Sequence, residues 1–341
     1  MKLLLPLFSV VLLYSCSEPK KPNTGIEIYD TDIEEIIDVT ASFEVIADSI
    51  ALPEGPVWDD SNQRLLFVDC LNDQIMQWTE KKGASKFIAP GGNTGYAPNL
   101  GQGVLGPNGL VIDNEGNLLV CQHGDRRVAI IENTTSEKPS YQTLVDNYQG
   151  LRLNSPNDLV IGSDGSVYFT DPPFAFFDLS NFSFVATEMR ELDFNGVYRY
   201  NRKTEDLTAL SRDVSMPNGL GLSPDERFLY VNSMGAPFSQ STPKIMRIDL
   251  SDMSQSIFFD GEELSKKYND GTDFDGMAIH SSGTIFTSGP GGLLVISPEG
   301  KLQARLNFGQ ITNCTFDAKE NYLYVTGFVT NPKVFRLKLK S

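Results

Sequence analysis

Six short turns along the chain each place one oxygen-bearing side chain directly before an apolar strand. Four of these side chains are Asn and two are carboxylates, and the turns repeat the pattern Pro-Asn-Gly-Leu with variations. The six residues are Glu54, Asn108, Asn157, Asn218, Asp275 and Asn313. Grouped together, they would present oxygen atoms to a ligand. That set suits a hard divalent cation such as Ca²⁺, which takes about six to eight oxygen ligands.

Other metal and catalytic chemistries lack the residues that they need. The chain has two His residues, His123 and His280, and neither lies in one of the six turns, so a nitrogen-rich zinc site cannot form there. It has no Gly-x-Ser-x-Gly elbow, no His-Glu-x-x-His and no phosphate-binding Gly-rich loop. Pro-Asn-Gly is also an ordinary turn sequence. That explanation accounts for the Asn residues but leaves Glu54 and Asp275 unexplained.

The strands that follow these turns indicate how the six residues come together. After each turn the chain shows three strands, and in five of the six copies a weaker fourth strand. Six repeats of a turn followed by three or four strands are typical of an all-β, six-bladed β-propeller with four-stranded blades. The innermost strands of a propeller begin near its axis, so we expect the six residues to be neighbours. Residues 43–47 can supply the strand missing from the last blade, so that the N-terminal strand closes the ring and residues 42–341 form one catalytic domain.

The N-terminal segment has the pattern of an export signal. Lys2 precedes an apolar run that ends near Cys16, and this run is too short to span a bilayer. The polar residues after Cys16 favour a bacterial lipoprotein signal over residues 1–16, with the lipid anchor on Cys16; a plain cleavable signal is the alternative. Residues 17–41 lack a clear strand pattern and are predicted to be a tether. We therefore expect an exported lipoprotein that faces the periplasm or lies on the cell surface.

Charge and cysteine content restrict the partners. The formal net charge is −16, from 44 acidic and 28 basic residues, so nucleic acid would be repelled. We expect membrane contact only through the lipid anchor, and the sequence leaves the oligomeric state open. Besides Cys16 the chain has Cys70, Cys121 and Cys314. A Cys70–Cys121 disulfide is conceivable, but buried free thiols are favoured.

Several of these segments resemble a known family. The gluconolactonase group of the senescence-marker-protein/gluconolactonase/luciferin-regenerating superfamily is similar to the chain from about residue 50 to 339. The most specific matches are residues 52–58 (LPEGPVW), 119–127 (LVCQHGDRR), 152–160 (RLNSPNDLV), 168–173 (YFTDPP), 216–220 (MPNGL) and 223–226 (SPDE). The resemblance implies a six-bladed propeller that uses a divalent metal ion to hydrolyse a sugar lactone.

The resemblance also implies the metal ligands and their chemistry. The implied ligands are Glu54, Asn157, Asn218 and Asp275. Ca²⁺ would be preferred, Mg²⁺, Mn²⁺ or Zn²⁺ would also be accepted, and the ion would polarise the lactone carbonyl. The family assigns the catalytic proton transfer to the position of Asp275. A carboxylate that binds a dication loses basicity. Asp171 and His123, which both lie at the ends of second strands, therefore remain competing candidates for the base.

Further residues are candidates for binding the substrate. They are Asn108, His123, Arg126, Arg152, Asp171 and Glu191, and Arg is suited to bidentate contact with oxygen. For His123 the alternative is a structural hydrogen bond. Some relatives carry a substrate-binding Arg where this chain has Ser155, so its lactone preference can differ. The Phe-rich stretch 174–192 is longer than a blade turn requires, and it is either a lid over the channel mouth or a locally packed loop.

These features predict a metal-dependent lactonase that opens a gluconolactone-type sugar lactone to the aldonic acid. Its substrate would be a small molecule and its cofactor one divalent ion. Two alternatives remain open. A related propeller hydrolase of other esters or phosphotriesters would use the same ion beneath a more apolar mouth. A non-catalytic sugar-binding lipoprotein would use the ring of oxygen-bearing residues only for stability.

Overall fold

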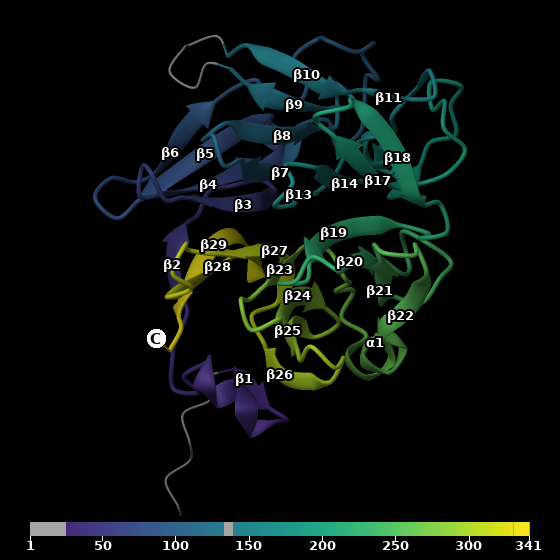
Figure 1. Cartoon of the computed structure of the whole chain (residues 1–341). Coiled ribbons are helices and arrows are strands. Elements are labelled where there is room, and N and C mark those ends of the chain that lie inside the picture. Colours follow the sequence, from purple (N-terminus) through teal and green to yellow (C-terminus); the bar gives the residue numbers. More distant parts are fainter. Residues whose placement is uncertain (1–24, 133–138, 330, 341) are drawn as a thin grey trace, which may run out of the picture.

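Six antiparallel sheets surround a central axis in the computed structural model, which describes residues 25–132, 139–329 and 331–340 (Figure 1). Each sheet contains one four-stranded blade, and the chain runs round the ring from blade one to blade six. The prediction of an all-β, six-bladed propeller is therefore confirmed. From inner to outer strand, the blades are β3 (Pro53–Asp59), β4 (Arg64–Asp69), β5 (Gln74–Thr79) and β6 (Gly83–Ile88); β7 (Pro107–Ile112), β8 (Leu118–Gln122), β9 (Arg127–Ile131) and β10 (Tyr141–Val145); β13 (Leu159–Ile161), β14 (Val167–Asp171), β17 (Gly196–Asn201) and β18 (Asp206–Ser211); β19 (Pro217–Leu222), β20 (Phe228–Ser233), β21 (Lys244–Asp249) and β22 (Gln255–Asp260); β23 (Met277–Ile279), β24 (Ile285–Gly289), β25 (Gly292–Ile296) and β26 (Leu302–Leu306); and β27 (Gln310–Phe316), β28 (Tyr322–Val329), β29 (Asn331–Lys338) and β2 (Glu44–Ala47).

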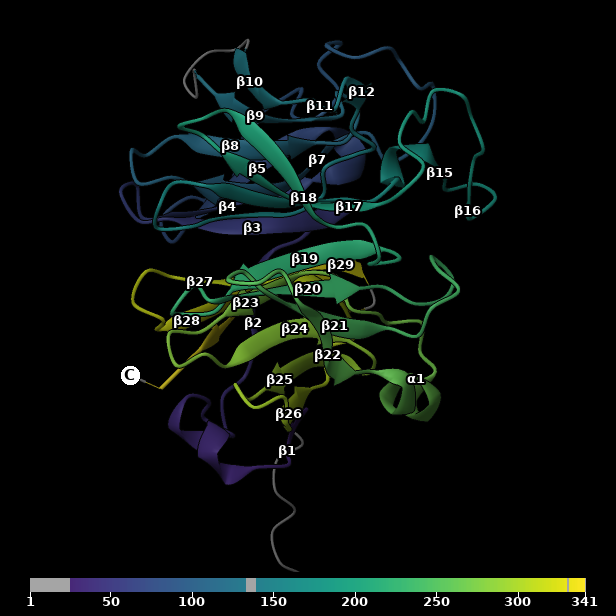
Figure 2. The same ribbon diagram turned by 45° about the vertical axis from the view of Figure 1, so that its right-hand side comes forward.

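Shorter elements occupy the loops between these strands. One small hairpin, β11 (Asn147–Tyr148) and β12 (Leu151–Arg152), lies in the loop before blade three. A second hairpin, β15 (Phe177–Asp178) and β16 (Ser183–Phe184), lies in the loop between β14 and β17, and Figure 2 shows it standing out from the strands of that blade. In the described part of the chain, no helix is long and apolar enough to cross a membrane. The short elements are β1 (Ile26–Ile28), β11 (Asn147–Tyr148), β12 (Leu151–Arg152), β15 (Phe177–Asp178), β16 (Ser183–Phe184), α1 (Glu262–Tyr268) and three 3₁₀ turns (Thr31–Glu35, Cys70–Asn72, Phe174–Phe176).

Apolar side chains fill the space between neighbouring blades. Strands such as β4 and β8 are buried on both faces, which explains their nearly continuous apolar sequences. Val68 of blade one, for example, packs in one cluster with Val120 of blade two. Cys70, Cys121 and Cys314 are buried free thiols, so the prediction of unpaired cysteines is confirmed for the described residues.

The first and last parts of the chain meet in blade six. The outer strand β2 pairs antiparallel with β29, and Glu44 lies opposite Arg336. Figure 1 shows purple β2 beside yellow β28 and β29. Ala47 and Ile50 then join a hydrophobic cluster with residues of blades one and six, including Phe67 and Tyr324. The predicted closure by the N-terminal strand is therefore confirmed.

The segment before β2 differs from the predicted tether. β1 pairs with β26 and adds a fifth strand to blade five. Ile33 and Ile37 are buried in the core cluster of blades five and six, and Glu27 forms an ion pair with Arg305 at 2.6 Å. Residues 26–41 are therefore packed on the propeller, because their spaced Ile side chains supply an apolar face. The predicted signal, Cys16 and the start of the tether lie outside the described residues.

Backbone hydrogen bonds tie the inner ends of neighbouring blades together at the glycines of the repeated turns. They join Gly109 N to Asn157 O, Gly219 N to Asp275 O and Gly276 N to Thr312 O, at 2.7 or 2.8 Å. A Cβ atom at position 219 would lie 2.5 Å from Asp275 O, so a larger residue cannot fit without a shift of the backbone. The repeated Gly therefore allows the blades to approach closely, and the side chain before it is brought to the axis.

Candidate active site

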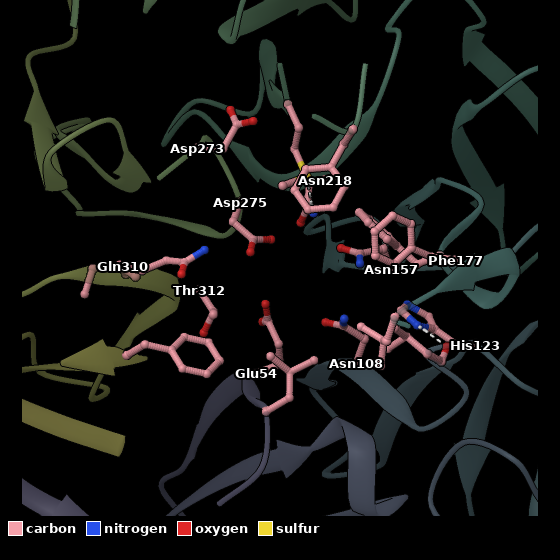
Figure 3. Close-up of a pocket in the computed structure, with 18 of the residues that line it drawn as sticks. Glu54, Asn108, His123, Asn157, Phe177, Asn218, Asp273, Asp275, Gln310 and Thr312 are labelled. Carbon is pink, nitrogen blue, oxygen red and sulfur yellow. Dashed lines mark hydrogen bonds between the residues drawn. The ribbon is translucent and has the colours of Figure 1, made fainter. Parts of the chain in front are cut away.

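Five of the six predicted oxygen-bearing side chains line one cavity at the axis. This cavity has a volume of about 220 Å³. Figure 3 shows the carboxylates of Glu54 and Asp275 and the amide groups of the Asn residues directed toward its centre. Each comes from a different one of the first five blades, at or next to the start of its inner strand. The five residues are Glu54, Asn108, Asn157, Asn218 and Asp275.

The sixth predicted residue, Asn313, is one position out of register. Thr312 O accepts a hydrogen bond from Gly276 N, just as Asp275 O accepts one from Gly219 N, so Thr312 holds the equivalent position and lines the cavity. Asn313 instead donates Nδ2 to Asp158 Oδ2 at 3.3 Å, and both side chains line a separate hollow. The prediction that all six residues converge is therefore corrected to five, with Thr312 in place of Asn313.

Neighbouring groups hold the backbone of Asp275 and the side chain of Asn218. Asp275 N donates to Ser288 Oγ at 2.6 Å, and Asp275 O accepts from Asn232 Nδ2 at 2.7 Å, so the backbone of Asp275 is held on both sides. Asn218 Nδ2 donates to Met234 Sδ at 3.2 Å, which leaves its amide oxygen available to the cavity. These contacts position residue 275 and orient the amide oxygen of Asn218 before a ligand binds.

The two carboxylates stand in an environment that disfavours their charges. Burial, followed by the charge of Glu54, raises the pKa of Asp275 well above its usual range. Burial, with the nearby Asp158, raises the pKa of Glu54 to about 8, although Gly55 N donates to Glu54 Oε2 at 3.0 Å. None of the described residues that line the cavity is Lys or Arg. A bound cation would offset this negative charge.

The donor set fits a hard divalent cation. Glu54, Asn157, Asn218 and Asp275 supply carboxylate and carboxamide groups, which are typical ligands of Ca²⁺ and similar ions. Among the residues that the structure describes, no cluster of three or more His, Cys, Asp or Glu side chains has metal-binding geometry. Ion binding would therefore depend on the Asn side chains together with the two carboxylates.

His123 also lines the cavity and presents an unpaired nitrogen. Its Nδ1 lies 3.1 Å from Val104 O and is therefore assigned as the donor, whereas Nε2 is buried and has no hydrogen-bond partner in the described structure. Burial lowers the pKa of His123 to about 4, so the ring is neutral at pH 7. The contact with Val104 matches the structural alternative for this residue, while Nε2 remains free to accept a hydrogen bond from a substrate.

Four predicted substrate contacts do not line the cavity. Asp171 accepts Asn154 N at 2.8 Å and Ser155 N at 2.7 Å, which positions the turn before Asn157. Arg126 donates to four backbone carbonyls, among them Met189 O at 2.7 Å. Glu191 Oε2 accepts the backbone N of Arg152 at 2.8 Å, whereas Arg152 Nη1 is buried without a hydrogen-bond partner among the described residues. The geometry thus gives Asp171, Arg126, Arg152 and Glu191 supporting positions and does not bring them to a ligand in this cavity.

One carboxylate and most of the apolar residues that line the cavity were not predicted from the sequence. Asp273 lines the cavity, where its oxygens accept Gly235 N and Phe274 N, both at 2.8 Å, and burial raises its pKa to about 7. Its position two residues before Asp275 was the only sequence signal. The stretch 174–192 combines the two predicted alternatives, since its Phe residues pack on one another and several also line the cavity.

The chain is a six-bladed propeller whose axial cavity is lined in part by carboxylate and carboxamide groups. Residues 52–328 match the SMP-30/Gluconolactonase/LRE-like region, so the chain belongs to this family, as the motifs predicted. It is 32% identical to the gluconolactonase of Zymomonas mobilis over 320 residues, and the aligned region covers 91% of this chain and 84% of that protein.

Two solved structures and a further curated relative are also similar to this chain. The gluconolactonase of Xanthomonas campestris is 26% identical, with a TM-score of 0.76 over 92% of this chain and 94% of that chain. The calcium-binding protein regucalcin from Agrobacterium tumefaciens is 16% identical, with a TM-score of 0.64 over 88% of this chain and 95% of that chain, and it shares the fold. The lactonase drp35 of Staphylococcus epidermidis is 24% identical over 200 residues, which are 57% of this chain and 54% of that protein.

Proposed function

We propose that this protein is a lactonase that hydrolyses a sugar lactone to the corresponding hydroxy acid with the help of one divalent cation. The observation that carries the proposal is the pair Glu54 and Asp275, two carboxylates directed into one oxygen-lined cavity without a cationic side chain among its described lining residues. The family relationship to gluconolactonases supports the same reaction.

The proposed metal ligands are Glu54, Asn157, Asn218 and Asp275. When bound, the cation supplies Lewis acidity that draws charge from the lactone carbonyl, and Ca²⁺ is the proposed native ion, with Mg²⁺, Mn²⁺ or Zn²⁺ as substitutes. The Asn side chains orient the substrate carbonyl, and Asn108 adds a further amide group beside it. The pre-set direction of these groups lowers the reorganisation needed during the reaction.

Asp275 is the proposed acceptor of the proton from the attacking water. Of the three predicted bases, Asp275 and His123 line the cavity, whereas both oxygens of Asp171 already accept backbone N–H groups. His123 has a low pKa of about 4, which suits a hydrogen-bond acceptor for a substrate hydroxyl better than a base at neutral pH. Water adds to the carbonyl carbon, the bond to the ring oxygen breaks, and that oxygen takes up a proton.

Metal dependence can be tested with proton release from glucono-1,5-lactone. The chain from Ser17 onward is stripped with chelator and then supplied with Ca²⁺, Mg²⁺, Mn²⁺ or Zn²⁺, and each ion alone serves as the control. We expect hydrolysis to return with at least one ion, and saturating ion to raise the Tm by about 5 to 10 °C. A rate equal to spontaneous hydrolysis with every ion would contradict the proposed activity.

We further propose that the protein is exported and anchored through a lipid on Cys16. Because β1 begins at Ile26, only residues 17–25 separate the anchor from the propeller, and this length reaches at most about 30 Å. The proposal predicts that Cys16→Ser moves the protein from the membrane fraction to the soluble exported fraction. Equal membrane retention of the wild type and this variant, measured by cell fractionation, would rule out the anchor.

A further inference from the structure

Part of the wall of the cavity is apolar. Half of the residues that line the cavity carry hydrophobic side chains, and they come from several separate loops and strands. They are Leu52, Val104, Phe174, Phe177, Leu179, Phe182, Met234, Phe238, Ile311 and Phe328. Five of these ten residues are Phe, so the cavity combines a polar end of carboxylates and amides at the axis with a Phe-rich end beside residues 174–182.

Four of the five Phe side chains form one continuous cluster at the cavity mouth. Ring centroids lie 5.0 Å apart for Phe177 and Phe182, 5.5 Å apart for Phe177 and Phe238, and 5.7 Å apart for Phe174 and Phe238. Phe174 and Phe177 are buried beneath, while Phe182 and Leu179 remain 55% and 49% exposed. Apolar side chains gathered in this way at a site entrance are typical of a surface that binds an apolar group.

Phe182 is held in a backbone conformation that is unfavourable for a bulky side chain. Its φ is +50°, in the left-handed region that Phe rarely adopts. The turn before it is fixed by Asp178, which accepts Ser180 N at 2.8 Å and Asn181 Nδ2 at 2.7 Å. The hairpin β15–β16 thus presents Phe182 at the mouth in spite of both solvent exposure and strain.

A plain polyhydroxylated lactone would use only part of this cavity. Each sugar hydroxyl needs a polar partner when it leaves water, and the Phe end offers none from its side chains. The amide and carboxylate end can hold the lactone group, while the Phe end requires an apolar group to cover it. The two ends together fit one molecule that carries a polar lactone ring and an apolar arm.

We propose that the substrates of this enzyme are lactones that carry an alkyl or aryl substituent, which binds against Phe177, Phe182 and Phe238. This inference rests on the proposed lactonase function and names the substrate class of the same site. Each methylene group that moves from water to the Phe wall strengthens binding about fourfold. A pentyl arm that is partly covered would therefore raise kcat/KM by about 100-fold.

Matched lactones test this substrate class. The metal-loaded protein is assayed with δ-valerolactone, with δ-decalactone, which adds a pentyl arm to the same ring, and with glucono-1,5-lactone. We expect kcat/KM for δ-decalactone to exceed that for δ-valerolactone by about 100-fold, and Phe182→Ala to reduce this ratio about tenfold. Val185→Ser is the control, because Val185 lies next to the same hairpin and is 36% exposed but does not line the cavity; its ratio should equal that of the wild type.

The outcomes separate this inference from the proposed function. If δ-valerolactone or glucono-1,5-lactone is hydrolysed but the pentyl arm gives no advantage, or if Phe182→Ala leaves the ratio unchanged, the substrate class is wrong and the lactonase stands. If none of the three lactones is hydrolysed with any of the four ions, both proposals fall. Phenyl acetate hydrolysis in that case would favour the ester hydrolase alternative.

Discussion

Replacement of Asp275 by Asn is expected to lower kcat/KM for lactone hydrolysis at least about 10³-fold. The variant loses both a ligand of the proposed ion and the proposed proton acceptor, while the backbone contacts of residue 275 with Ser288 and Asn232 can persist. The measurement is the lactone hydrolysis rate with saturating ion. Asp252→Asn, which changes an exposed Asp in a surface turn, is the control and should retain the rate.

A stability measurement distinguishes this loss of activity from misfolding. Because burial and then the charge of Glu54 raise the pKa of Asp275 in the folded state, its ionised form destabilises the fold above the pKa of an unfolded Asp, and Asp275→Asn should raise the Tm of the chelated protein at pH 8. Added ion should then raise the Tm of the variant much less than that of the wild type. Activity of the variant within tenfold of the wild type would show that Asp275 is not the proton acceptor. An unchanged rise in Tm on addition of the ion would show that Asp275 is not a ligand of the ion.

Removal of β2 is expected to destabilise the whole propeller. A chain that begins at residue 52 lacks the outer strand of blade six and the buried side chains of Ala47 and Ile50. The loss of these contacts and the exposed edge of β29 should lower the free energy of unfolding by about 5 kcal/mol, or the Tm by more than about 10 °C. Thermal unfolding followed by circular dichroism measures the change.

A second truncation isolates the role of β2 from that of the residues before it. A chain that begins at Ser42 loses β1 and the buried Ile33 and Ile37 but keeps the pairing of β2 with β29. We expect this chain to remain a folded, closed ring with a smaller loss of stability. If the two truncated chains unfold at the same temperature, the pairing of β2 with β29 does not hold the ring closed.

The repeated turns predicted the propeller fold and most of the cavity, because the Gly of such a turn and the residue before it each have a structural role. Gly permits the close approach of neighbouring blades, and the residue before it then faces the axis, as at Asn218 and Asp275. The sixth turn was misread by one residue. Its sequence, Thr312-Asn313-Cys314, contains Asn but no Gly, so the pattern alone could not decide which residue occupies the axial position.

The remaining errors concern side chains whose partners are far away in the sequence. Arg126 was predicted to meet the substrate because it lies in a loop near His123, yet backbone carbonyls from two other loops take up its guanidinium group. The apolar wall was visible only as a Phe-rich stretch, because Phe238 and Phe328 come from other blades. Such contacts depend on how loops pack, and no local periodicity predicts them.

The pairing of β2 with β29 also sets the order of events during synthesis. The two strands are separated by almost the whole chain, with Glu44 opposite Arg336, so β2 must wait without its partner until the last blade has been made. Contacts of such long sequence separation form slowly. A chain that is still being synthesised therefore cannot close its ring until β29 has been made.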